Sequence, residues 1–186
     1  MKKTEVDFKI TNVGAKGRII KEINNRPAAS ELLRLLGWSE ENLNEDTWFK
    51  TNYYFPLSFQ LNDNQKILCP RVIVGVFGES LITTIKSNKS KSSILTIDGK
   101  GLLQAVKENL QSFPNNPEFG LIASCTTRLE TLEDYSYQVN EYLNEYFDKK
   151  PFIEVYVGGE STYSPHKGLV FMNMSFNTAI FWDGAN

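Results

Sequence analysis

Hydrophobic and polar residues alternate along the first part of the chain, and this period of two predicts β-strands. Val6, Phe8 and Ile10 alternate with polar residues, and the two glycines within 12–17 are typical of a turn. The run 18–23 is predicted to form a second strand, so the segment as a whole predicts a hairpin. Further short β-rich runs occur at 53–59, 67–69, 72–77, 81–85, 94–97, 119–124, 152–157 and 169–181.

Three segments instead repeat their apolar residues every three or four positions, which predicts amphipathic helices. The first begins at Pro27, carries four leucines and is expected to end at Gly37. The second is capped by Asp98. The third is predicted to begin at a capping-box variant formed by Thr131 and Asp134 and to end near Phe147.

Strands outnumber helices in this pattern and follow one another in runs. This order predicts an α+β fold with a mixed, mainly antiparallel sheet, about three packed helices and a single domain. The chain has 186 residues, of which 41% are hydrophobic and 23% are charged. That composition supplies a core and excludes disorder for most of the chain.

Charge and hydropathy exclude several partners. The chain has 20 Lys and Arg residues and 22 Asp and Glu residues, and it has no sustained basic run. This charge balance argues against nucleic acid as a binding partner. The longest apolar run, 72–78, is far shorter than the roughly 20 residues of a membrane span. The N-terminal segment lacks the apolar core of a secretory signal, so we expect a cytoplasmic protein whose Cys69 and Cys125 are thiols.

Common catalytic and cofactor motifs are absent from the sequence. There is no dinucleotide or phosphate-loop fingerprint, and His166 is the only histidine. A histidine-based catalytic triad or metal site is therefore nearly excluded, and we expect neither a metal nor a cofactor.

Three polar segments follow or interrupt predicted strands and are the candidate functional residues. They are 124–128 with Cys125 and Arg128, 156–161 with Tyr156, Gly159 and Glu160, and the pair Asn177 and Thr178. Because strand ends far apart in sequence can meet at one sheet edge, these segments are candidates for one pocket. For each, an ordinary structural role remains open: a buried thiol, a structural ion pair or a glycine turn.

The order of these segments resembles the C-terminal domain of the FIST family, named for F-box and intracellular signal-transduction proteins. The resemblance rests on Ser-Cys-Thr-Thr-Arg at 124–128, Tyr-Val-Gly-Gly-Glu at 156–160 and Phe-Asn-Thr-Ala at 176–179. It covers 18–181, leaving 1–17 as an N-terminal extension and 182–186 as a tail. Glu154 stands where the resemblance leads us to expect a small residue.

The resemblance implies a sensory or signal-transduction domain that binds a small ligand, with amino acids suggested, and is not an enzyme. Arg128 is then expected to hold a carboxylate and Glu160 an ammonium group, with Asn177 and Thr178 bonding the remaining polar atoms. Cys125, Tyr156 and Gly159 complete the predicted ligand site. The resemblance further implies a FIST N-terminal domain or a signalling output domain as partner.

Two other functions remain open from the residues alone. A protein-interaction module is one, with the aromatic residues Trp48, Phe49, Tyr53 and Tyr54 as candidate contacts. An enzyme with Cys125 as nucleophile is the other, although the sequence offers no evident base for it.

Overall fold

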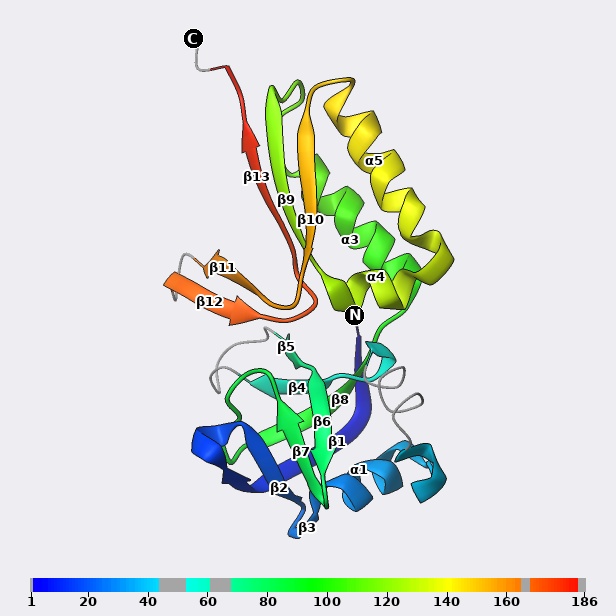
Figure 1. Ribbon diagram of the computed structural model, residues 1–186, viewed down its shortest axis with the longest axis vertical. Coiled ribbons are helices and arrows are strands. Elements are labelled where there is room, and N and C mark those ends of the chain that lie inside the picture. The colour runs from blue at the N-terminus through cyan, green and yellow to red at the C-terminus, as the bar shows by residue number, and fades with distance from the viewer. Residues whose placement is uncertain (1, 44–52, 61–67, 165–167, 184–186) are drawn as a thin grey trace. The chain divides into compact units, whose positions relative to one another are not determined.

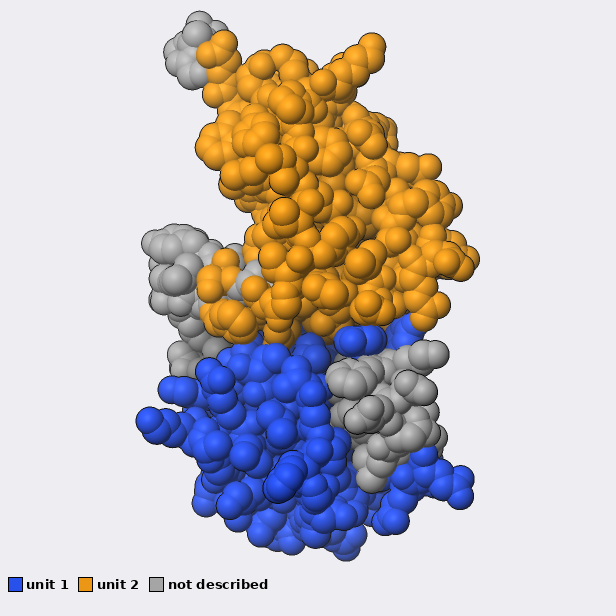
Figure 2. All heavy atoms as spheres, in the orientation of Figure 1, with its two compact units in different colours: residues 1–96 blue, residues 97–186 orange. Residues whose placement is uncertain are grey.

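The computed structural model describes residues 2–43, 53–60, 68–164 and 168–183 (Figure 1). Its contacts divide the chain into two compact units, 1–96 and 97–186, which Figure 2 colours blue and orange. Among the described strand pairs only β9 and β10 run parallel, and the others are antiparallel. The predicted α+β class with a mixed, mainly antiparallel sheet is confirmed. The domain limits implied by the resemblance stay a prediction.

Unit 1 is built from an antiparallel sheet and one longer helix. Its elements are β1 (Lys2–Gly14), η1 (Ala15–Gly17), β2 (Ile19–Ile23), β3 (Arg26–Pro27), α1 (Ala28–Leu36), η2 (Glu40–Leu43), β4 (Leu57–Gln60), β5 (Leu68–Arg71), β6 (Ile73–Phe77), β7 (Ser80–Thr83) and β8 (Lys91–Thr96). The strand order is β5-β4-β8-β1-β2-β7-β6, with β3 paired to β2. The predicted first hairpin is confirmed as β1 and β2.

Helix α1 closes one side of the unit 1 core. Pro27 precedes it and Gly37 ends it in the left-handed conformation at φ 70°, as the sequence predicts. Its buried residues, among them Leu32 and Leu33, pack with strand residues such as Ile10 into one cluster.

One predicted loop differs from expectation. The polar sequence Lys-Ser-Asn-Lys-Ser-Lys at 86–91 predicts a solvated hairpin loop, but the flanking strands β7 and β8 pair with other strands. Ser87 within it is buried, and its N–H donates to the carbonyl oxygen of Gly17 at 2.7 Å. The loop is therefore attached to the β1–β2 turn, because its backbone supplies the hydrogen-bond partner that the turn needs.

Glu31 on α1 is a buried carboxylate with several donors. Arg34 Nε and Nη2 each donate to it at 2.8 Å, Asn24 Nδ2 donates at 2.9 Å, and Arg26 Nη1 lies 3.7 Å away. The hydrogen bonds from Arg34 are the largest cause that lowers the pKa of Glu31 from 4.5 to about 2, against the opposing effect of burial.

Replacing Glu31 with glutamine is expected to cost stability in a pH-dependent way. A lowered folded-state pKa adds stability that is present above pH 4.5 and lost as the pH falls toward 2. Because Arg34 is half exposed, solvent screening reduces the effect to about 2 kcal/mol at pH 7. Urea unfolding at pH 7, 5 and 3 measures it, with exposed Glu5→Gln as control. A loss that is the same at every pH would contradict the assignment.

Unit 2 packs helices against a three-stranded sheet. Its elements are α3 (Gly99–Gln111), β9 (Phe119–Cys125), α4 (Thr126–Leu132), η3 (Glu133–Ser136), α5 (Tyr137–Phe147), β10 (Phe152–Val157), β11 (Glu160–Ser164), β12 (Gly168–Met172) and β13 (Phe176–Phe181). The sheet order is β10-β9-β13, and β11 pairs with β12. Figure 1 shows α3, α4 and α5 along one side of this sheet.

The predicted cap of α3 is confirmed, since Asp98 Oδ1 accepts from the N–H of Gly101 at 2.6 Å. The predicted start of the next helix is wrong. Helix α4 begins at Thr126, directly after β9, and Thr131 lies inside it, with its hydroxyl donating to the carbonyl oxygen of Thr127 at 2.8 Å. The expected strand or hairpin at 169–181 is two strands that do not pair with each other, because β12 pairs with β11 and β13 with β9.

No helix among the described residues is long and apolar enough to cross a membrane.

Candidate functional site

Arg128 lies on α4 and is buried on the helix-covered side of the sheet. Its Nη2 donates to the carbonyl oxygen of Leu102 in α3 at 3.1 Å, and its guanidinium carbon lies 5.4 Å from the centre of the Phe176 ring. The same side of the sheet carries Glu154 and Tyr156 from β10, which are two residues apart and therefore face the same way.

Arg128, Glu154 and Tyr156 form an electrostatic cluster. Burial raises the pKa of Glu154, while the hydrogen bond from Tyr156 and the charge of Arg128 oppose that rise. Burial, with the nearby Glu154 charge, raises the pKa of Tyr156 to about 12. Glu154 Oε1 is buried and has no hydrogen-bond partner within the described part of the chain. The cluster thus holds one cation against one partly buried acid.

Cys125 ends β9 as a buried thiol. Its Sγ lies 3.5 Å from the hydroxyl oxygen of Thr127, and its N–H donates to the carbonyl oxygen of Ser175 at 3.1 Å. Only 1% of its surface is exposed, so solvent reaches it poorly.

The glycine segment after β10 brings the backbone close to an aromatic ring. A Cβ on Gly159 would lie 2.5 Å from Cζ of Phe171 on β12, so only glycine fits there without a shift. Glu160 begins β11 and pairs with Met172 through the backbone. The Glu160 side chain lies outside the described residues, and the predicted ammonium contact stays a prediction.

Asn177 and Thr178 are consecutive in β13 and so point to opposite faces of the sheet. The hydroxyl of Thr178 contacts Asn109 Oδ1 on α3 at 2.9 Å, whereas Asn177 Nδ2 donates to Ser175 Oγ at 2.9 Å. The structure therefore brings Arg128 and Tyr156 together on the face that Thr178 also occupies. It places Asn177 on the other face.

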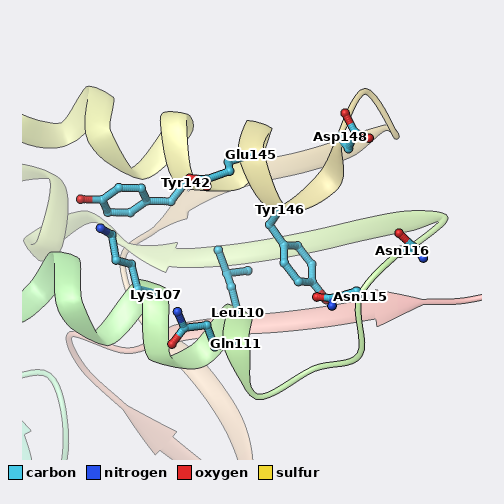
Figure 3. A pocket seen from close by; sticks show the side chains of 9 residues that line it. All are labelled: Lys107, Leu110, Gln111, Asn115, Asn116, Tyr142, Glu145, Tyr146 and Asp148. Atoms are coloured by element: carbon cyan, nitrogen blue, oxygen red, sulfur yellow. The ribbon is translucent and has the colours of Figure 1, made fainter.

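A separate groove opens between α3, α5 and the loop 113–117 (Figure 3). It has a volume of about 550 Å³, within the range of about 300–1,000 Å³ that small-molecule sites occupy. The side chains shown in Figure 3 line it: Lys107, Leu110, Gln111, Asn115, Asn116, Tyr142, Glu145, Tyr146 and Asp148.

Two aromatic contacts fix the groove walls. The Lys107 ammonium lies 4.2 Å from the centre of the Tyr142 ring, a cation–π contact that positions the charge. The Tyr146 hydroxyl donates to the carbonyl oxygen of Pro114 at 2.9 Å and ties the loop to α5. Burial raises the pKa of Tyr146, so this hydroxyl keeps its proton and remains a donor. The groove thus offers a ligand one positioned ammonium group, two carboxylates and several side-chain amides.

None of the groove residues was among the sequence candidates. Tyr142 and Tyr146 follow the three- and four-residue spacing of the predicted helix that ends near Phe147, which indicates core positions, but in α5 they are only half-buried and line the groove. The sequence 113–117, with two prolines and two asparagines, predicts the end of a helix but gives no sign of a groove. Asn116 adopts the left-handed conformation at φ 61°, which is typical of a tight turn. The Asn-Asn-Pro sequence is consistent with such a turn, because asparagine tolerates a positive φ.

No protein family, curated protein or solved structure matches the chain. Among the described residues no group of three or more His, Cys, Asp or Glu side chains is placed to hold a metal ion.

Proposed function

We propose that this protein is a signalling domain that binds a small zwitterion of the amino-acid class in the groove between α3 and α5. The observation that carries the proposal is the groove itself, which is lined by the Lys107 ammonium, positioned against Tyr142, and by the acids Glu145 and Asp148. A zwitterion carries one positive and one negative charge. The groove lining offers a cation for the negative group and two acids for the positive group.

The groove residues take distinct roles in this proposal. Lys107 binds the ligand carboxylate, because an ammonium already held by an aromatic ring loses little further freedom on binding. Glu145 receives the ligand ammonium. The amides of Gln111 and Asn115 supply both donors and acceptors for the remaining polar atoms.

The sequence-based alternative places the same ligand between Arg128 and Glu160. The groove is the better candidate because Arg128 is buried and its guanidinium already donates a hydrogen bond to the carbonyl oxygen of Leu102. The burial of Cys125 similarly favours binding over catalysis, since a nucleophile must be reached by its substrate. Buried Cys69 and Cys125 thiols support a reducing, cytoplasmic location, and a signalling output domain remains the proposed partner.

A thermal-shift screen with the twenty amino acids and small carboxylates tests the proposal. A ligand at 100 times its Kd is expected to raise the melting temperature by about 5–10 °C for a chain of this length. Lys107→Gln and Glu145→Gln should each remove the shift, because each deletes one charged contact.

Lys100→Gln is the matched control, an exposed lysine on the same helix that does not line the groove. A shift that survives Lys107→Gln but disappears in Arg128→Lys would contradict the groove and favour the alternative site. A flat screen would contradict binding of this ligand class.

A further inference from the structure

The face of the unit 2 sheet opposite the helices is apolar and open. Its outward residues are Phe119, Leu121 and Ala123 from β9, Ile153 and Val155 from β10, and Asn177, Ala179 and Phe181 from β13. Four of the large side chains are about half exposed: Leu121 at 42%, Ile153 at 52%, Val155 at 46% and Phe181 at 49%. Strands that alternate in this way normally bury an apolar face against another layer.

No charged residue points outward on these three strands. The only polar outward side chain is Asn177, whose Nδ2 already has a partner in Ser175. A partner with a charged surface would lose hydration here without gaining a complementary charge. The chemistry of the face therefore fits another uncharged, apolar sheet.

Large and small outward residues lie on opposite flanks of the central strand. Ile153 and Ala179 both pair with Leu121, one from each side, and so lie at the same level of the sheet. Val155 and Asn177 flank Ala123 in the same way, two residues further along β9. The smaller β13 side chains leave a hollow of about 340 Å³ over this part of the face.

A two-fold axis that runs along β9, between two facing sheets, makes this asymmetry self-complementary. It places β10 of one copy over β13 of the other, so that Ile153 meets Ala179 and Val155 meets Asn177. On the two flanking strands each β10 side chain then covers a smaller β13 side chain, in both halves of the interface at once, whereas Leu121 lies on the axis and meets the Leu121 of the other copy. An axis perpendicular to the strands would instead place β10 over β10 and set the large residues against each other.

We propose that this face is a homodimer interface, in which two copies of the chain pack their unit 2 sheets together about a two-fold axis along β9. Three of the four half-exposed residues are aliphatic, and even at the upper aromatic value of about 250 Å² per side chain the four would leave no more than about 500 Å² open. A stable interface takes about 800 Å² from each partner. The expected dimer is therefore reversible, with a Kd in the micromolar range.

Analytical ultracentrifugation of the full chain, from roughly 5 to 500 µM, measures this equilibrium. Wild type is expected to shift from monomer to dimer across the range. Ile153→Glu and Ala179→Lys should each weaken association at least tenfold, because each places an unpaired charge in the apolar interface. Phe77→Glu is the control, an aromatic residue that is 77% exposed in unit 1, and it should leave association unchanged.

The double variant Ile153→Glu with Ala179→Lys tests the axis itself. In the proposed dimer each new glutamate faces the partner's new lysine, so association should return to within about threefold of wild type and become salt-dependent. Circular dichroism of each variant confirms that the fold persists. A monomeric wild type, or unchanged association of Ile153→Glu, would overturn the interface. Failure of the double variant to recover would overturn the axis.

Discussion

Replacing Arg128 with alanine is expected to lower the free energy of unfolding by about 3 kcal/mol, because the guanidinium holds several elements of unit 2 together. It donates to the backbone of α3 at Leu102, lies on the Phe176 ring of β13, and offsets the partly buried charge of Glu154. For a chain of this length the loss corresponds to roughly 6–12 °C in melting temperature.

Two companion variants separate the contributions of Arg128. Arg128→Lys keeps the charge but loses the planar fork, so an intermediate loss is expected. Arg128→Ala with Glu154→Gln should recover part of the loss, because the neutral amide does not need the cation. Urea unfolding measures all three. A loss below about 0.5 kcal/mol for Arg128→Ala, the size typical of surface changes, would contradict a structural role and favour the ligand-binding role that the family resemblance implies.

Gly120→Ala is the second change with a large expected effect. A Cβ at Gly120 would lie 2.2 Å from Cζ and 2.7 Å from Cε1 of Phe147, whose side chain is fully buried against β9. Phe147 also stacks on Phe152 with 5.1 Å between ring centres, so it has little room to move. Overpacking of this kind is expected to cost about 2–3 kcal/mol.

The matched control is Gly158→Ala, where a Cβ would meet nothing within 4 Å and stability should change by less than about 0.5 kcal/mol. Combining Gly120→Ala with Phe147→Leu should cost at least 1 kcal/mol less than the sum of the two single changes, since the smaller side chain relieves the clash. Additive losses would mean that the strain at Gly120 has another source.

The fold was predictable from the sequence where periodicity and capping agreed. The apolar residues that repeat at helical spacing in α3 are all buried, and Asp98 caps the helix as expected; they are Leu102, Leu103, Val106 and Leu110. The start of α4 was missed because β9 passes directly into the helix without a linker. Thr131 and Asp134 imitate a cap, but the Thr131 hydroxyl bonds to the preceding turn instead.

The candidate site was less predictable, because strand ends show which residues lie at an edge but not which face they occupy. Asn177 and Thr178 were assigned to one pocket, yet neighbouring residues in a strand point to opposite faces. Glu154 was set aside as a departure from a family pattern, although it shares a face with Tyr156. The groove is formed by Lys107 and Tyr142, which lie on helices separated by a strand and another helix, so no local motif marks it.

In the proposed function, a zwitterion binds between α3 and α5. The most direct test is a two-dimensional amide NMR titration of the full chain with the amino acid that gives the largest thermal shift. The proposed function predicts saturable shifts at Lys107, Asn115, Asn116 and Tyr142, all lost in Lys107→Gln. Shifts confined to residues 125–128 and 156–160, with the groove amides unmoved, would contradict it.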